Sequence, residues 1–273
     1  MELSWLESLI YGLISGFAEF LPVSSLAHQT VFLKLIGAED QPLLRLWAHL
    51  GAFAALLSLL FPALLRMRRE RKIAAMGKKR RRQPDETTLM ESRVLRMAMI
   101  SMLVLFLGCS LVGELYQRLW VLAIFMAVNG IVLYLPQYLP SANKGAVSMS
   151  ALDAMLIGLS AGAGIVPGLS AMGCSVSVAR IRGAERRYAT ELALMLGLGA
   201  LAAWMIIDVI GAVSAPGVTE MNFLNGVTVA LAAFASGYLG IKLARFLAVK
   251  AGYSGFAYYC WGAALFTLIL YLI

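Results

Sequence analysis

The amino-acid sequence predicts an all-α polytopic membrane protein with six transmembrane helices and two re-entrant helical hairpins. Of its 273 residues, 60% are hydrophobic and 14% are charged, whereas soluble domains carry about 25% charged residues. Several apolar stretches reach the roughly 20 residues that a helix needs to cross a bilayer. We expect residues 1–273 to form a single integral membrane domain. Its expected spans are residues 43–65, 94–113, 119–139, 189–210, 223–247 and 256–273.

Basic residues predict the orientation in the membrane. The segment from residue 66 to residue 96 carries twelve Lys or Arg and four acidic residues, and it joins two of the expected spans. Because basic loops stay on the cytoplasmic side, we expect this segment to be cytoplasmic and to touch anionic lipid heads. The net charge of +8 is therefore better explained by this loop than by a nucleic-acid partner.

Two segments must enter and leave the membrane on the same side if the basic residues that flank the spans are to face the cytoplasm. Threading the spans from the basic loop leaves twenty basic residues inside and three outside. Seven acidic residues, including Glu114, Asp208 and Glu220, then lie outside. The threading requires hairpins at residues 1–40 and 151–179, which Gly and Pro interrupt. Non-helical backbone at membrane depth needs protein or water around it, and such paired broken segments indicate a binding site near the midplane.

The two interrupted segments resemble each other, which predicts an inverted repeat. The first reads GLISGFAEFLPVSSLAH and the second reads GLSAGAGIVPGLSAMGCS. Pro22 matches Pro167 and Ser25 matches Ser170, both at a spacing of 145 residues, while the opening Gly-Leu pairs match after a slip of one residue. Each half then supplies one hairpin and three spans. The halves are residues 1–140, with the basic loop at 66–93, and residues 141–273.

Each break carries the residue types that start a new helix inside the membrane. Pro cannot continue the preceding helix, and a Ser just after it can cap the next one. The new helix then begins at mid-membrane with free N–H groups and a positive dipole end, which attract an anion. Two such ends that converge from opposite faces suit a phosphate or a diphosphate. Capping alone is the simpler interpretation of the serines, and it does not exclude binding.

Glu19 is the strongest candidate for function, because an ionisable side chain within a membrane segment is costly and commonly marks a site. Structural pairing of Glu19 is the alternative. His28 can share a helix face with Ser24 and Ser25, four and three residues before it, although a satisfied interface histidine is a simpler interpretation. His49 begins a span near the outer surface, and we expect it to be a packing residue.

The stretch GFAEFLPVSSLAH, residues 16–28, resembles the first signature of the bacterial undecaprenyl-pyrophosphate phosphatases, the bacitracin-resistance family. AHLGAFAALL, VPGLSAMGCS and RRYATELALML resemble three further segments of that family in the same order. The resemblance implies removal of one phosphate from undecaprenyl diphosphate, so that the monophosphate re-enters the carrier cycle of peptidoglycan and other surface polymers. It also implies six spanning helices with two re-entrant hairpins, a location in the bacterial inner (plasma) membrane, and a site that faces the outside.

The resemblance further implies roles for individual residues. Glu19 matches a glutamate that holds a divalent cation, Mg²⁺ or Ca²⁺, or acts as a general base. Ser25 matches a candidate nucleophile or phosphate ligand, and His28 matches a histidine that takes or gives a proton. The expected partners are a polyprenyl diphosphate and the lipid bilayer, with a homodimer left open. The expected substrate-binding residues are Ser24, Gly168, Ser170 and Ser175.

The chain departs from the family signatures at two important positions. Ser15 stands where the first signature has a glutamate, and Ala171 stands where the second has an arginine. Because an arginine beside a diphosphate makes bidentate contacts and neutralises developing charge, its loss weakens the expected catalysis. Two hypotheses follow: a polyprenyl-diphosphate phosphatase, or a catalytically degenerate relative that binds or transports a polyprenyl phosphate or another anionic lipid. We expect Arg180 and Arg182 to lie too near the cytoplasmic surface to replace the missing arginine.

Overall fold

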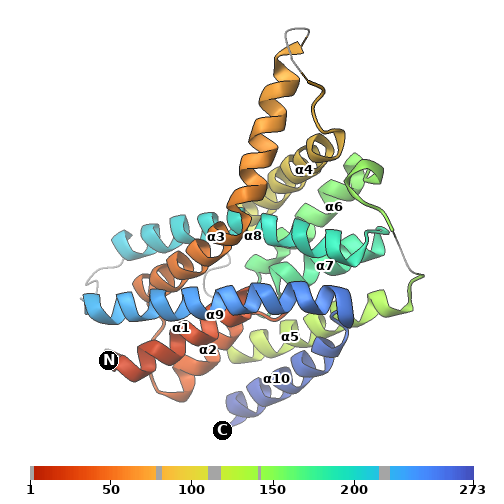
Figure 1. Ribbon diagram of the computed structural model, residues 1–273. Helices are drawn as coiled ribbons and strands as arrows, with labels where there is room; N and C mark the ends of the chain where they lie inside the picture. The colour runs from red at the N-terminus through yellow and green to blue at the C-terminus, as the bar shows by residue number, and fades with distance from the viewer. Residues whose placement is uncertain (1–2, 78–81, 110–117, 141–142, 215–221) are drawn as a thin grey trace.

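The computed structural model describes residues 3–77, 82–109, 118–140, 143–214 and 222–273. Within these residues the chain is built from α-helices joined by turns and short 3₁₀ segments (Figure 1), which confirms the all-α class. The helices are α1 (Trp5–Glu19), α2 (Ser25–Leu35), α3 (Pro42–Ala75), α4 (Glu86–Cys109), α5 (Leu119–Tyr134), α6 (Ala151–Gly162), α7 (Ala171–Ile181), α8 (Arg186–Ser214), α9 (Phe223–Lys250) and α10 (Gly255–Leu272).

Among the described helices, five are long and apolar enough to cross a membrane. They are α3, α5 with the turn that follows it, α8, α9 and α10. The chain is therefore a multi-pass membrane protein. The sixth expected span coincides with α4 up to residue 109. Its last residues, 110–113, lie outside the described part of the chain, as do Glu114, Glu220 and the basic residues 78–81.

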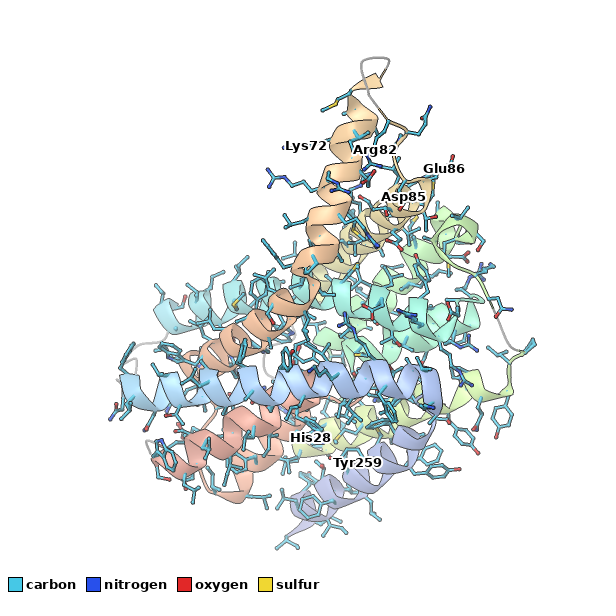
Figure 2. The ribbon with its side chains drawn as sticks, viewed as in Figure 1. His28, Lys72, Arg82, Asp85, Glu86 and Tyr259 are labelled. Carbon is cyan, nitrogen blue, oxygen red and sulfur yellow. The ribbon has the colours of Figure 1, made fainter. Side chains whose placement is uncertain are left out.

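The basic segment lies where α3 extends beyond the body of the molecule (Figure 1). The second half of α3 and the start of α4 project together, and Lys72, Arg82, Asp85 and Glu86 lie on this projection (Figure 2). Glu70 accepts one hydrogen bond from the Arg82 guanidinium and another, of 3.0 Å, from the backbone N–H of Asp85. The projection thus carries its charges away from the apolar helices, and the Glu70 carboxylate joins α3 to the segment before α4.

Four helices are too short to cross a bilayer, and they come in two pairs. α1 and α2 have 15 and 11 residues, and α6 and α7 have 12 and 11. At 1.5 Å per residue none of them reaches the roughly 30 Å of a hydrocarbon core. The first pair is interrupted at residues 20–24 and the second at residues 163–170. Both interruptions lie where Gly and Pro predict them.

The packing of the helices follows the order expected of an inverted repeat. α1 packs on α9 while α6 packs on α4, and α3 packs on α9 while α8 packs on α4. α3 and α8 pack on each other, as do α5 and α10. Exchanging each helix of the first half for its counterpart in the second therefore reproduces these packed pairs.

The structure corrects the register of the repeat by one residue. The Ser24 hydroxyl caps α2 and the Ser170 hydroxyl caps α7, each accepting the backbone N–H three residues further on, at 3.3 and 3.0 Å. Ser24 and not Ser25 is therefore the counterpart of Ser170, at a spacing of 146 residues. The same spacing relates Ser4 and Ser150, which cap α1 and α6. The sequence match paired Ser170 with the wrong one of two adjacent serines, because either serine could cap the helix.

Gly158 allows α6 to approach α4 closely, and its replacement gives a test of the packing. A Cβ atom at this residue would lie 2.0 Å from the carbonyl oxygen of Ala98. We expect Gly158→Ala to lower the free energy of unfolding by about 1–3 kcal/mol, the usual cost of overpacking. Gly262→Ala on α10 is the matched control, since nothing lies within 4 Å of its Cβ position, and we expect it to stabilise the helix by about 0.5–1 kcal/mol. Thermal unfolding of the purified variants measures the difference, and equal midpoints would contradict this close approach.

Candidate active site

The two helix breaks meet at one polar cavity. Its walls include Glu19 at the end of α1, Ser24 and Ser25 at the start of α2, and Ser170 and Ala171 at the start of α7. The prediction that the two interrupted segments share a polar cavity is confirmed. The other lining residues are Val23, Leu26, His49, Phe106, Gly164, Leu169, Ala200 and Trp204.

Hydrogen bonds across the breaks hold the two helix starts side by side. The Ser24 hydroxyl accepts the backbone N–H of Gly168 at 3.2 Å. The Ser170 hydroxyl donates to the carbonyl of Leu21 at 3.4 Å. Each break is thus fastened to the other through the serine that also caps its own helix. Both serines are buried. Their hydroxyls form hydrogen bonds across the breaks, and these bonds fix the shape of the cavity.

Asn129 on α5 reinforces this arrangement, and it was not among the expected site residues. Its side chain donates to the carbonyl of Pro22 and accepts the backbone N–H of Ser170, both at 3.0 Å. Asn129 is completely buried, where unpaired amide groups are costly, so these bonds satisfy the side chain and the broken backbone together. The available sequence signal was a lone carboxamide in the middle of an apolar span.

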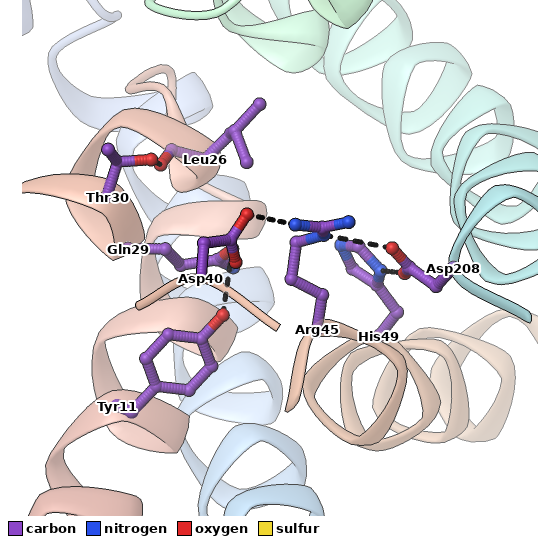
Figure 3. Close-up of polar contacts among 8 residues, drawn as sticks. All are labelled: Tyr11, Leu26, Gln29, Thr30, Asp40, Arg45, His49 and Asp208. Atoms are coloured by element: carbon purple, nitrogen blue, oxygen red, sulfur yellow. Dashed lines mark hydrogen bonds and ion pairs between the residues drawn. The ribbon is translucent and has the colours of Figure 1, made fainter. Parts of the chain in front are cut away.

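Ser25 presents its hydroxyl at the first turn of α2. The oxygen donates to the carbonyl of Ser15 at 3.3 Å and accepts from the Gln29 amide at 3.1 Å. Gln29 in turn accepts a hydrogen bond of 3.2 Å from Tyr11 (Figure 3). In the corrected register the counterpart of Ser25 is Ala171, so the second break has no hydroxyl at this position. Ser25 is only half-buried, which makes it the serine best placed to meet a ligand.

Glu19 is the one acidic residue among those that line the cavity. None of the salt bridges within the described part of the chain involves its carboxylate. The structural ion pair considered as an alternative is therefore not found there. A carboxylate that lines a cavity and makes no salt bridge can hold a cation or take a proton.

A group of ionisable side chains, in which His49 and Asp208 are buried and Arg45 and Asp40 are partly buried, lies beside the cavity (Figure 3). Nδ1 of His49 is 2.6 Å from one carboxylate oxygen of Asp208, and Nε of Arg45 donates to the other at 2.9 Å. Arg45 also pairs with Asp40. His49, which we expected to be a packing residue, therefore belongs to the polar wall of the cavity. Sequence reasoning assigned no role to Arg45 or Asp208.

His28 lies away from this cavity. One ring nitrogen is 2.6 Å from the Ser24 carbonyl, and the other is 2.7 Å from the Tyr259 hydroxyl. The His28 and Tyr259 rings are stacked with their centres 5.6 Å apart, between α2 and α10 (Figure 2). His28 lines instead an apolar groove. The structure does not bring it together with Glu19 and Ser25, and its role in proton transfer stays a prediction.

Gly168 and Ser175 also lie outside the lining of the cavity. Gly168 has a positive φ of 95°, and a Cβ there would lie 2.7 Å from the carbonyl oxygen of Leu122. Glycine is therefore needed for the shape of the second break. Ser175 is buried and donates to the carbonyl of Met172 at 3.1 Å. Their contact with substrate stays a prediction, whereas Ser24, Ser25 and Ser170 line the cavity.

The position of the missing arginine is part of the cavity, because Ala171 lines it. Arg182 instead pairs with Asp153 at 2.6 Å. Arg180 donates to the carbonyl of Ala184. Neither arginine lines the cavity, in agreement with the expectation that they do not replace the lost group.

Comparisons with known proteins extend over nearly the whole chain. A protein of Methanobrevibacter smithii named undecaprenyl-diphosphatase is 28% identical over 267 residues, which cover 94% of this chain and 94% of that protein. A protein of Carboxydothermus hydrogenoformans with the same name is 29% identical over 273 residues, covering 97% and 96%. The sequence profile described as Bacitracin resistance protein BacA matches residues 8–266. The chain therefore belongs to the bacitracin resistance protein BacA family.

Proposed function

We propose that this protein is an integral membrane phosphatase that hydrolyses undecaprenyl diphosphate to undecaprenyl monophosphate and inorganic phosphate. The reaction returns the carrier lipid to the synthesis of cell-envelope polymers. The observation that carries the proposal is that the starts of α2 and α7 open on the same cavity as Glu19 and Ser25. Membership of the family, together with the names of its relatives, supports undecaprenyl diphosphate as the lipid.

The two helix starts supply the groups that bind an anionic headgroup. The first N–H groups of a helix have no partner within the helix, and the helix dipole places partial positive charge there. In α2 and α7 the cap serine takes the third N–H, so the first two remain for phosphate oxygens. The low dielectric of the membrane interior strengthens such contacts. Converging helix starts can therefore bind a diphosphate without the family arginine.

Hydrolysis breaks the bond between the terminal phosphorus and the bridging oxygen of the diphosphate. The attacking oxygen comes from water, or first from the Ser25 hydroxyl and then from water. Glu19 lies in the same cavity and can take a proton from the attacking group. As the bond breaks, negative charge moves to the bridging oxygen, and amides aimed at the phosphates stabilise that charge.

A divalent cation fits this site as a ligand shared between protein and lipid. No group of three or more His, Cys, Asp or Glu in the described residues could hold a metal ion by itself. Mg²⁺ is commonly held by one or two carboxylates together with substrate phosphates, whereas Ca²⁺ takes 6–8 oxygen ligands. Glu19 with the diphosphate oxygens therefore suits Mg²⁺ better. When bound, the ion neutralises phosphate charge.

The proposed location is the plasma membrane of a bacterium, with residues 66–96 in the cytoplasm and the cavity facing the outside. The charge pattern supports this orientation. Along α3, His49 lies in the first third of the helix, whereas the basic residues from Arg66 onward lie in the last third. The cavity thus lies nearer the end of α3 that is away from the basic projection.

Phosphate release by the purified protein tests the proposed function. We expect release of phosphate from undecaprenyl diphosphate in detergent, with a rate that falls on chelation by EDTA and returns with Mg²⁺. Undecaprenyl monophosphate should appear in equal amount. Binding of the lipid without any turnover would contradict the proposal and favour a carrier that has lost hydrolysis.

A further inference from the structure

We propose that His49, oriented by Asp208, exchanges a proton with the attacking oxygen in this cavity. The inference rests on the proposed function and assigns to His49 the chemistry that the sequence resemblance gives to His28. His49 would be the catalytic residue, because it lines the cavity. Asp208 and Arg45 would be positioning residues that act through it.

The contacts of His49 indicate which of its two ring nitrogens is available to a ligand in the cavity. Asp208 is completely buried, and its two oxygens face Nδ1 of His49 and Nε of Arg45. A carboxylate accepts hydrogen bonds, so Nδ1 carries the proton and Nε2 of the neutral ring is an acceptor. Nε2 makes no hydrogen bond to a residue that the structure describes. The ring can therefore present an acceptor to a bound headgroup.

Aromatic packing fixes the plane of the ring. His49 stacks on Trp204 with ring centres 5.9 Å apart and an angle of 25° between the planes. Trp204 is in turn held edge-on by Phe106 at 5.2 Å. Both aromatic residues line the same cavity. The Asp208 carboxylate therefore restrains one edge of the His49 ring, and Trp204 restrains one of its faces. These two contacts keep the ring in a fixed orientation.

His28 differs from His49 in each of these respects. Both of its ring nitrogens already have partners, the Ser24 carbonyl and the Tyr259 hydroxyl. It lines the apolar groove and not the cavity that contains Glu19. Proton transfer by His28 would require it to break two hydrogen bonds and to turn away from Tyr259, whereas His49 needs no such change.

The chemical step balances with these groups. Nε2 takes the proton of the attacking O–H as its oxygen bonds to the terminal phosphorus, and the bond from that phosphorus to the bridging oxygen breaks. Undecaprenyl monophosphate leaves with the electron pair, and the imidazolium is stabilised by the Asp208 carboxylate, as an aspartate does for a catalytic histidine elsewhere. The proton then passes to the departing phosphate. The charged groups facing His49 are Asp208 on α8, Glu19 on α1, and Arg45 and Asp40 beside it.

Two substitutions and a matched control test this assignment. We expect His49→Ala and Asp208→Asn to lower kcat by about 10²–10⁴-fold, the usual contribution of general acid–base catalysis, with little change in KM. Added imidazole should restore part of the His49→Ala rate. Asp153→Asn is the control, because Asp153 is equally buried and also pairs with an arginine, but it lies outside the cavity. It should lower stability without lowering kcat.

A spectroscopic test does not depend on turnover. The chain has two histidines, so a His28→Gln protein contains one imidazole, and its ¹⁵N signals can be assigned directly. We expect the proton on Nδ1 in this protein and a shift toward the Nε2–H tautomer when Asp208→Asn is added. Unchanged tautomers, or a His49→Ala protein that hydrolyses at the wild-type rate, would overturn the inference. A wild-type protein without hydrolysis would instead contradict the proposed function, while the tautomer would still report on the His49–Asp208 pair.

Discussion

Glu19→Gln lowers the rate of phosphate release by about 10³-fold, within the range for losing a general base or a charged transition-state contact. The substitution keeps the size of the side chain and removes its charge. Because Glu19 is the one carboxylate that lines the cavity, no neighbouring lining residue can take its place as a carboxylate ligand for Mg²⁺. The measurement is phosphate release from undecaprenyl diphosphate at saturating lipid, with and without Mg²⁺.

The control for Glu19 is a glutamate of similar exposure that lies elsewhere. Glu191 on α8 makes a two-point ion pair with Arg245, at 2.8 and 2.9 Å, and it does not line the cavity. Glu191→Gln is expected to lower stability by up to about 1 kcal/mol and to leave the rate nearly unchanged. Equal losses of rate in the two variants would show that the effect of Glu19→Gln is on folding, and would contradict its role in the site.

The two helix breaks could be predicted because their causes are local. Pro22 and Pro167 lack the backbone N–H that a continuing helix needs, and a serine two or three residues later caps the next helix. Local chemistry leaves open which of two adjacent serines is the cap. Only the backbone geometry, in which the hydroxyl of Ser24 reaches the N–H three residues further on, decides that Ser24 corresponds to Ser170.

The polar wall of the cavity could not be predicted in the same way, because its members are distant in sequence. His49 and Asp208 are 159 residues apart, and each has only apolar neighbours on either side along the chain. Only the packing of α3 on α8 brings them into contact. The position of His28 also depends on a residue that is distant in sequence. Helical spacing correctly predicts that His28 lies one turn from Ser24. Its ring, however, contacts Tyr259 on α10 and does not line the cavity.

Ala171→Arg raises the rate of phosphate release by about 10²-fold, the lower end of the effect of one transition-state donor. Ala171 is the first residue of α7 and lines the cavity beside Ser170. A guanidinium placed there can make bidentate contacts with the diphosphate and can add a full charge to the partial charge of the helix start. The measurement is kcat at saturating lipid, compared with the wild-type protein under the same detergent and Mg²⁺ concentration.

Ala171→Met is the control, because it adds a long side chain without charge. We expect it to leave the rate unchanged or to lower it by filling the cavity. Ser15→Glu, at the other departure from the family signatures, should not give a comparable gain, since Ser15 is buried with its hydroxyl bonded to the Tyr11 carbonyl at 2.7 Å. A carboxylate there would be buried beside Glu19 without a basic partner, and burial of unpaired charge is costly. Equal rates for Ala171→Arg and Ala171→Met would mean that the converging helix starts already supply all the positive charge that the reaction needs.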